Sequence, residues 1–145
     1  MIDRHFIEAK LSYIESYCTE LDNILLSADI EIKEDFIKLR ALERILQLIV
    51  DEIIDINNHI IRYYPLSLPE DFQSSFRTLS DYKILPEEFA KKIAPVVGLR
   101  NRIVHRYEKT DIDLLIQFIR KNREDFKQYS RCIFEFINKN LVKMY

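Results

Sequence analysis

Four polar side chains that could act on a phosphate ester lie close together in the second half of the sequence. They are Arg100, Asn101, His105 and Tyr107. The apolar residues around them predict a helix in which Arg100 falls on the apolar arc, while Asn101 and His105 share a neighbouring face. Burying an unpaired guanidinium is costly, so Arg100 needs a carboxylate, a phosphate or a partner subunit. The four side chains are therefore candidates for a site at the edge of an apolar surface.

These residue types suit proton transfer and the stabilisation of negative charge. Histidine ordinarily titrates near pH ~6.5, which allows it to accept and donate protons under neutral conditions. Arginine offers a planar, charged fork that matches phosphoryl oxygens. An arginine followed five positions later by a histidine also arises by chance. Side chains of these types near a helix end would equally cap carbonyls, pair with acids and complete a core, so both interpretations stay open on spacing alone.

Two residues that alter the backbone precede this group. Gly98 is the only glycine in the chain, and a glycine inside a helix costs about 1 kcal/mol relative to alanine. We therefore expect Gly98 to mark the close approach of another backbone. Pro95 lacks the amide proton for a helical hydrogen bond, so we expect it to bend the segment.

Charge is distributed unevenly along the chain. The formal net charge of −2 excludes a broadly basic surface for nucleic acid. From Lys91 to Lys109, however, six cations accompany one anion. A local basic face favours a phosphate-bearing partner. Cations near a helix C-terminus are also expected because they complement the helix dipole, so this alternative stays open.

Composition and periodicity predict an all-α protein. A length of 145 residues suffices for one domain with a core. One glycine and four prolines leave few of the turn residues that a sheet needs. A slip in the apolar phase near Lys121 and Asn122 predicts a break in the last helix. We expect a single domain, residues 1–145, folded as an up-and-down bundle of five to six helices. The expected helices cover about 3–26, 32–64, 69–82, 86–106 and the segment from 110 onward.

The helix predicted over 32–64 is apolar around much of its circumference. Such a helix is either central to a bundle or shared between the core and a subunit interface. Its polar residues Glu52, Asp55 and His59 form one narrow stripe. We expect the inward apolar positions of the other helices to include Phe72 and Leu114.

The sequence predicts a reduced, cytoplasmic protein. Cys18 and Cys132 lie on apolar faces of the first and last helices, where we expect free core thiols rather than a disulfide. The N-terminal residues lack the pattern of a signal peptide, and no apolar run reaches membrane-spanning length. We therefore expect no membrane partner.

Several common catalytic and cofactor-binding patterns are absent from the sequence. One glycine excludes a glycine-rich phosphate loop, and His5, His59 and His105 are not at metal-ligand spacing. We expect no cofactor and no metal. Asp55 and His59, four positions apart, could be a ligand pair or a base and its orienting acid, but a local ion pair explains the same spacing.

Four motifs, in their order and intervals, resemble HepT-like proteins of the HEPN superfamily. The most specific is the last, in which Arg100, His105 and Tyr107 match the family pattern Arg-x4-His-x-Tyr, and Asn101 is the polar residue that usually follows the arginine. The resemblance extends roughly from residue 36 to residue 118. The motifs are Asp55-Ile-Asn-Asn-His-Ile60, Pro69-Glu-Asp-Phe72 with Phe76, Ile84-Leu-Pro-Glu-Glu-Phe-Ala90 and Val97-Gly-Leu-Arg-Asn-Arg-Ile-Val-His-Arg-Tyr107.

The resemblance implies a homodimeric, metal-independent ribonuclease that is the toxin of a toxin–antitoxin pair. The implied antitoxin has the minimal nucleotidyltransferase (MNT) fold and attaches AMP to Tyr107. RNA carries its own nucleophile, the 2′-hydroxyl, so a cleaving site needs a proton acceptor, a proton donor and charge stabilisation. Two chains that face each other would supply two copies of His105, together with Arg100. Arg102 and Arg106 are candidates for binding RNA phosphates.

Two other interpretations remain at this point. The chain could be a non-catalytic helical partner that regulates the nucleotidyltransferase or presents a substrate to it. It could also be a purely structural bundle in which Arg100 pairs with Glu52 or Asp55.

Overall fold

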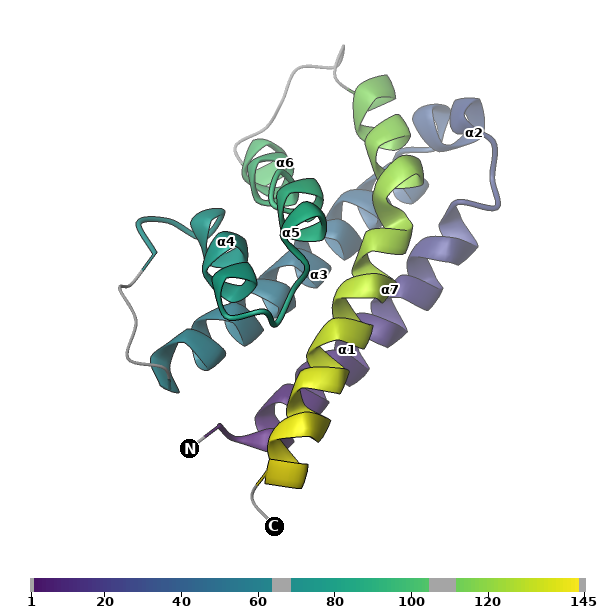
Figure 1. The fold of residues 1–145 in the computed structure, drawn as a ribbon. Helices are drawn as coiled ribbons and strands as arrows, with labels where there is room; N and C mark the ends of the chain where they lie inside the picture. The colour runs from purple at the N-terminus through teal and green to yellow at the C-terminus, as the bar shows by residue number, and fades with distance from the viewer. Residues whose placement is uncertain (1, 64–68, 105–111, 144–145) are drawn as a thin grey trace.

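The computed structural model describes residues 2–63, 69–104 and 112–143. These residues form helices and no strand, which confirms the predicted all-α class (Figure 1). The described part of the chain contains seven helices rather than five or six. They are α1 (Arg4–Ile24), α2 (Asp29–Glu34), α3 (Phe36–Tyr63), α4 (Ser74–Asp81), α5 (Glu87–Ile93), α6 (Val96–Val104) and α7 (Ile112–Lys143).

Three long helices form the body of the bundle. Helix α1 runs antiparallel to α3 and α7, and α4, α5 and α6 lie together on one side (Figure 1). Side-chain bonds join the start of α1 to the far ends of the other two long helices: the Asp3 amide donates to His59, and Arg4 donates to Asn138. At the opposite end, Lys33 pairs with Asp113 at the start of α7. The short α4–α6 segment returns the chain to the end of the bundle at which α3 begins.

Helix α3 is the centre of the fold, as its apolar circumference predicts. It contacts α1, α2, α4 and α6, and a helix that contacts neighbours on several sides needs apolar residues around most of its girth. The buried residues of α3 are Leu39, Leu42, Ile45, Leu46, Ile49, Val50, Ile53, Ile54, Ile56, Asn57, Ile60 and Ile61. Helix α1 buries one apolar face, which includes Ile7, Ile14, Cys18 and Leu21.

The predicted helix over 32–64 is in fact two helices separated at Asp35. Asp35 is extended, with φ −98° and ψ 100°, and its carboxylate accepts hydrogen bonds from the amides of Ile37 and Lys38. Aspartate favours this capping position because its side chain satisfies amides that have no partner within the helix. Residues 29–31, which precede the predicted helix, belong to α2.

Two other predicted boundaries were wrong. The helix expected over 86–106 divides into α5 and α6 at Ala94 and Pro95, because proline cannot donate the helical hydrogen bond. Conversely, α7 continues through Lys121 and Asn122 without the predicted break. Its apolar phase slips because α7 packs against α2 near its start and also against α1.

Phe72 and Leu114, which were predicted to point inward, lie on the surface, and so does Phe36 of α3. Phe36, Phe72 and Leu114 are 70%, 52% and 65% exposed. Phe36 and Leu114 lie in the first turns of α3 and α7. Leu114 faces away from the core, whereas the next residue, Leu115, is buried. Phe72 precedes α4, and its carbonyl accepts the hydroxyl of Ser75.

A buried polar chain connects α3, α4 and α7. Tyr129 donates its hydroxyl to Asn57 Oδ1, Asn57 Nδ2 donates to Ser75 Oγ at 2.9 Å, and Ser75 Oγ donates to the Phe72 carbonyl at 2.6 Å. Burial raises the pKa of Tyr129 well above its ordinary value, so the hydroxyl keeps the proton that it donates. The chain satisfies polar groups that would otherwise be costly to bury.

The cysteine prediction is confirmed. Cys18 is buried, Cys132 is half-buried, and both are free. Burial raises the pKa of the Cys18 thiol to about 11, which keeps it protonated and unreactive at neutral pH. Within the described ranges, no helix is long and apolar enough to cross a bilayer.

We predict that Tyr129→Phe lowers the free energy of unfolding by about 1–3 kcal/mol, because the buried Asn57 Oδ1 loses its donor. Tyr13→Phe removes the hydroxyl of a tyrosine that is 53% exposed and serves as the matched control. We expect the control to stay within about 0.5 kcal/mol of the wild type. Urea denaturation at one fixed protein concentration measures both variants, and equal losses would contradict a special role for the buried hydroxyl.

Candidate active site

Arg100 pairs with an acid on the central helix. Its Nε donates to Asp51 Oδ1 at 2.9 Å, and the two side chains are 26% and 37% exposed. The partner is neither Glu52 nor Asp55, which both lie 3.0 Å from Lys10 Nζ. Those pairings were therefore wrong, although the expectation that Arg100 needs a countercharge is confirmed.

Helix α6 brings Arg100 to this position by packing on α3. Val96, Val97 and Leu99 are buried and hold the first turns of α6 against the bundle. The predicted apolar arc then leaves the core, since Ile103 is only partly buried and Val104 is 41% exposed. Arg100 thus lies where the buried part of α6 gives way to its surface part.

The structure brings together two of the predicted site residues. Arg100 Nη1 donates to Asn101 Oδ1 at 3.4 Å, a long contact between adjacent residues. Arg102 is exposed on the same helix. His105, Arg106 and Tyr107 lie outside the described residues, so their convergence with Arg100 stays a prediction.

Gly98 does not approach another backbone among the residues that the structure describes. A Cβ built at this position would meet none of their atoms within 4 Å, and the φ of Gly98 is not positive. The expected close approach is therefore not found within the described part of the chain. Neither crowding by these residues nor the backbone conformation requires glycine here.

The local excess of cations is partly neutralised by the fold. Lys92 pairs at 3.2 Å with Asp125 of α7, whose side chain is only 3% exposed, and Lys91 lies within salt-bridge distance of Glu87 and Glu88. Lys91 and Lys92 are therefore paired with acids of α5 and α7 and do not form an unpaired basic face.

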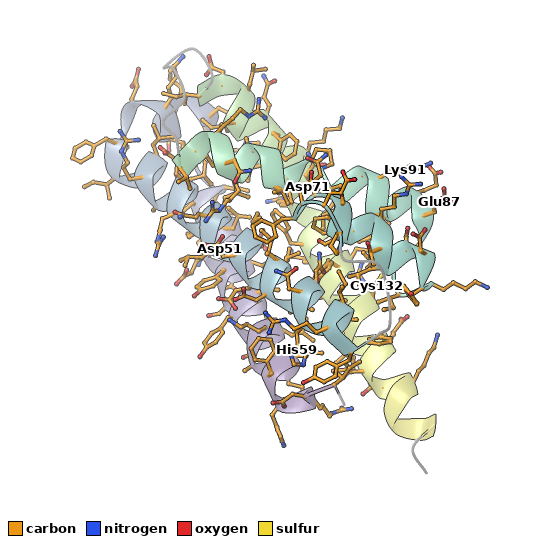
Figure 2. All side chains as sticks on the ribbon, turned by 90° about the vertical axis from the view of Figure 1, so that its left-hand side faces the viewer. Asp51, His59, Asp71, Glu87, Lys91 and Cys132 are labelled. Carbon is orange, nitrogen blue, oxygen red and sulfur yellow. The ribbon has the colours of Figure 1, made fainter. Side chains whose placement is uncertain are left out.

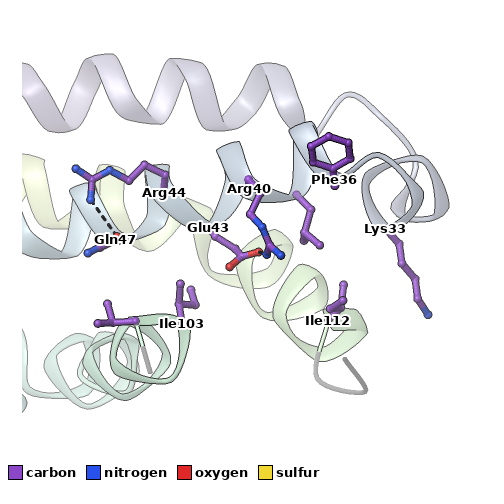
Figure 3. Close-up of a pocket in the computed structure, with 10 residues that line it drawn as sticks. Lys33, Phe36, Arg40, Glu43, Arg44, Gln47, Ile103 and Ile112 are labelled. Atoms are coloured by element: carbon purple, nitrogen blue, oxygen red, sulfur yellow. Dashed lines mark hydrogen bonds and ion pairs between the residues drawn. The ribbon is translucent and has the colours of Figure 1, made fainter. Parts of the chain in front are cut away.

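A groove of about 1110 Å³ lies between the first half of α3, the end of α6 and the start of α7 (Figure 3). Val104 and Ile112, the described residues that flank 105–111, both belong to its wall. Arg40 pairs with Glu43 at 2.7 Å, and Arg44 donates to Gln47 at 3.1 Å. The groove is lined by Lys33, Phe36, Leu39, Arg40, Glu43, Arg44, Gln47, Ile103, Val104 and Ile112.

Sequence reasoning missed these groove residues. Arg40 and Arg44 are one helical turn apart on α3, and the polar stripe predicted on this helix, Glu52, Asp55 and His59, does not include them. The available signal was a pair of arginines at this spacing on one side of an otherwise apolar helix. That signal does not indicate which distant helix faces the arginines.

The possible Asp55–His59 pair does not form. Asp55 binds Lys10, whereas His59 Nε2 accepts the Asp3 amide at 3.1 Å and its ring stacks on Phe6 with centroids 4.5 Å apart. Burial lowers the pKa of His59, which keeps the ring neutral and able to accept this bond. His59 and Asp51 lie on separate parts of α3 (Figure 2). His59 therefore attaches the N-terminal segment to α3, away from Arg100.

Comparisons with known proteins agree with the motif and the fold. A family model described as ribonuclease HepT-like matches residues 14–133. A tRNA nuclease HepT of Aphanizomenon flos-aquae is 34% identical over 139 residues, which cover 94% of this chain and 92% of the relative. An mRNA nuclease HepT of Shewanella oneidensis is 30% identical over 99 residues, or 68% and 74% of the two chains.

Solved structures share the same arrangement of helices. The tri-AMPylated HEPN toxin of Shewanella oneidensis, in complex with an MNT antitoxin, superposes with a TM-score of 0.83 at 26% identity and covers 92% of this chain and 99% of the toxin. A cytosolic protein of unknown function from Bacillus subtilis also has a TM-score of 0.83, at 22% identity over 97% and 94% of the chains, which supports the fold alone. From the matched family, the similar relatives and the shared fold, the chain belongs to the HepT-like ribonucleases of the HEPN superfamily.

Proposed function

We propose that this chain is the toxin ribonuclease of a toxin–antitoxin pair. It cleaves RNA without a metal ion, at a site completed by a second copy of the chain. The observation that carries the proposal is the placement of Arg100, since its guanidinium is paired with Asp51 yet still partly open to solvent. A partly exposed, oriented guanidinium next to a family motif is suited to binding a phosphate.

In the proposed reaction, the RNA 2′-oxygen attacks the adjacent phosphorus and the 5′-oxygen leaves. His105 of one chain takes the proton of the 2′-hydroxyl, and His105 of the second chain gives a proton to the leaving oxygen. The products are a 2′,3′-cyclic phosphate and a free 5′-hydroxyl, so no water or cofactor enters this step. Arg100 stabilises the charge that develops on the phosphoryl oxygens, and Asn101 assists as a neutral hydrogen-bonding group.

The proposed RNA contacts outside the reacting phosphate are Arg102 and Arg106. Arg102 is exposed on α6, where a cation can bind a neighbouring phosphate without a buried partner. The proposed protein partner is an MNT-fold nucleotidyltransferase, by analogy with the complex of the similar Shewanella oneidensis toxin. This partner would transfer AMP from ATP to the Tyr107 hydroxyl and release pyrophosphate.

We predict that the purified protein cleaves RNA in the presence of EDTA and that Arg100→Ala or His105→Ala reduces the rate by about 100-fold or more. Arg100→Lys should be almost as impaired, because lysine keeps the charge but loses the planar fork. Arg131→Ala and Arg131→Lys, at an exposed arginine of α7, are matched controls that should retain the wild-type rate. Intact RNA together with tight binding of the nucleotidyltransferase would instead support a non-catalytic partner module.

We also predict a twofold-symmetric dimer in which the α6 helices of two chains lie close together near Gly98. In the monomer, Gly98→Ala should be tolerated, because the added Cβ meets no atom of the described residues within 4 Å and alanine favours a helix by about 1 kcal/mol. At a close twofold interface the same methyl group should weaken association. Light scattering across micromolar concentrations tests this, with circular dichroism as a control for folding. A monomeric wild type would exclude the two-chain site.

We predict that coexpression with the nucleotidyltransferase and ATP adds one or more AMP units to Tyr107 and abolishes cleavage. Tyr107 is close in the sequence to Arg100 and Arg106. Each adenylate attached to it adds an anionic phosphate that competes with RNA phosphates for these arginines. Intact-mass spectrometry measures the addition, and Tyr107→Phe should prevent it. An unchanged mass, or an AMP adduct that persists in the phenylalanine variant, would contradict this assignment.

A further inference from the structure

Asp51 binds Arg100 through only one part of the guanidinium. The bond runs from Nε to Asp51 Oδ1 at 2.9 Å. Nη1 makes a long contact of 3.4 Å with Asn101, and Nη2 donates to no group among the described residues. The terminal pair of nitrogens, which forms the two-pronged end of the side chain, is therefore left largely unused.

We propose that Asp51 is a positioning residue of the RNA-cleaving site. By holding Nε, its carboxylate fixes the plane of the Arg100 guanidinium and leaves Nη1 and Nη2 to bind the reacting phosphate. This inference rests on the proposed ribonuclease function. An arginine has several rotatable bonds, so a side chain that is already oriented loses less freedom when the phosphate arrives.

Stability alone gives a weak reason for this ion pair. Arg100 and Asp51 are 26% and 37% exposed, and partly exposed ion pairs contribute little to folding. Helix α6 is already held by the buried Val96, Val97 and Leu99. A carboxylate close to an RNA-binding site also repels phosphates. Positioning provides the compensating benefit, because the acid neutralises the side of the guanidinium that turns away from the phosphate.

The neighbouring acids of α3 serve a different partner. Glu52 and Asp55 both lie 3.0 Å from Lys10 on α1, whereas Asp51 contacts α6. Asp55 is therefore a close control for Asp51, because it lies one turn further along the same helix and also pairs with one cation. It differs in having no contact with Arg100.

The test compares Asp51→Ala, Asp51→Asn and Asp55→Ala with the wild type. Cleavage is followed under single-turnover conditions with bulk tRNA and with a transcribed mRNA. Binding is measured with a fluorescent single-stranded 2′-O-methyl RNA, which has no free nucleophile. Thermal melting reports the fold. These three readouts separate the rate of the chemical step, the affinity for RNA and the stability of the protein.

For Asp51→Ala we expect a cleavage rate about 10-fold below that of the wild type. Small misplacements of a catalytic group cost up to about 100-fold in rate. The RNA affinity of this variant should be unchanged or slightly higher, because a negative charge is lost. Asp51→Asn keeps an oxygen that can accept from Nε, so its loss should be smaller. Asp55→Ala should cleave within about twofold of the wild type.

Three results would overturn the inference. One is wild-type cleavage by Asp51→Ala while Arg100→Ala is inactive, which would leave the ribonuclease proposal intact. Another is a rate loss that Asp55→Ala shares, or that follows a lowered melting temperature, because it would indicate a purely structural acid. The third is a wild-type protein that cleaves neither RNA, which would overturn the ribonuclease proposal and this one with it.

Discussion

The burial of α3 is the constraint on which the rest of the structure depends. Because α3 is apolar around most of its girth, α1, α2, α4 and α6 must all cover it. Three of its polar residues then become points at which the neighbouring helices are fixed. Asn57 is satisfied by α4 and α7, Asp55 by α1, and Asp51 by α6. The position of Arg100 is thus a consequence of how a hydrophobic helix is enclosed, and its ion pair refines a packing that apolar contacts establish.

The long helices were predictable because their apolar residues recur over several turns, where periodicity is a strong signal. Short interruptions between helices were less predictable. Asp35 and Pro95 each follow the end of a helix, but the residue type alone does not show whether the chain bends, is capped or leaves the helix there. Pro95 was correctly expected to disturb α6, while the phase slip at Asn122 was mistaken for a break. A phase slip marks a change of packing partner as readily as a change of backbone direction, and the sequence alone does not distinguish the two.

The need of Arg100 for an acidic partner was predictable, whereas the identity of that partner was not. An arginine on an apolar arc requires a countercharge, and Arg100 has one. Choosing among Asp51, Glu52 and Asp55 was beyond spacing arguments, because adjacent residues of a helix point about 100° apart and the rotation of α6 about α3 is a tertiary property. Counting charges along the sequence overstated the basic surface, because the ion pairs that neutralise a cation depend on tertiary packing. Lys92 counts toward a basic stretch in the sequence, yet Asp125 of α7 neutralises it in the fold.

The buried polar chain and Arg100 occupy different environments in the bundle. The hydrogen-bonded chain through Asn57 and Tyr129 is fully buried, whereas Arg100 lies where α6 emerges onto the surface. Under the proposed mechanism Arg100 must stay oriented while RNA enters, and attachment to the central helix provides that rigidity. One histidine per motif cannot serve as acid and base in the same step. A rigid arginine on each chain would then define where the second chain must bring its histidine, so the packing of α6 on α3 would set the geometry of both halves of the site.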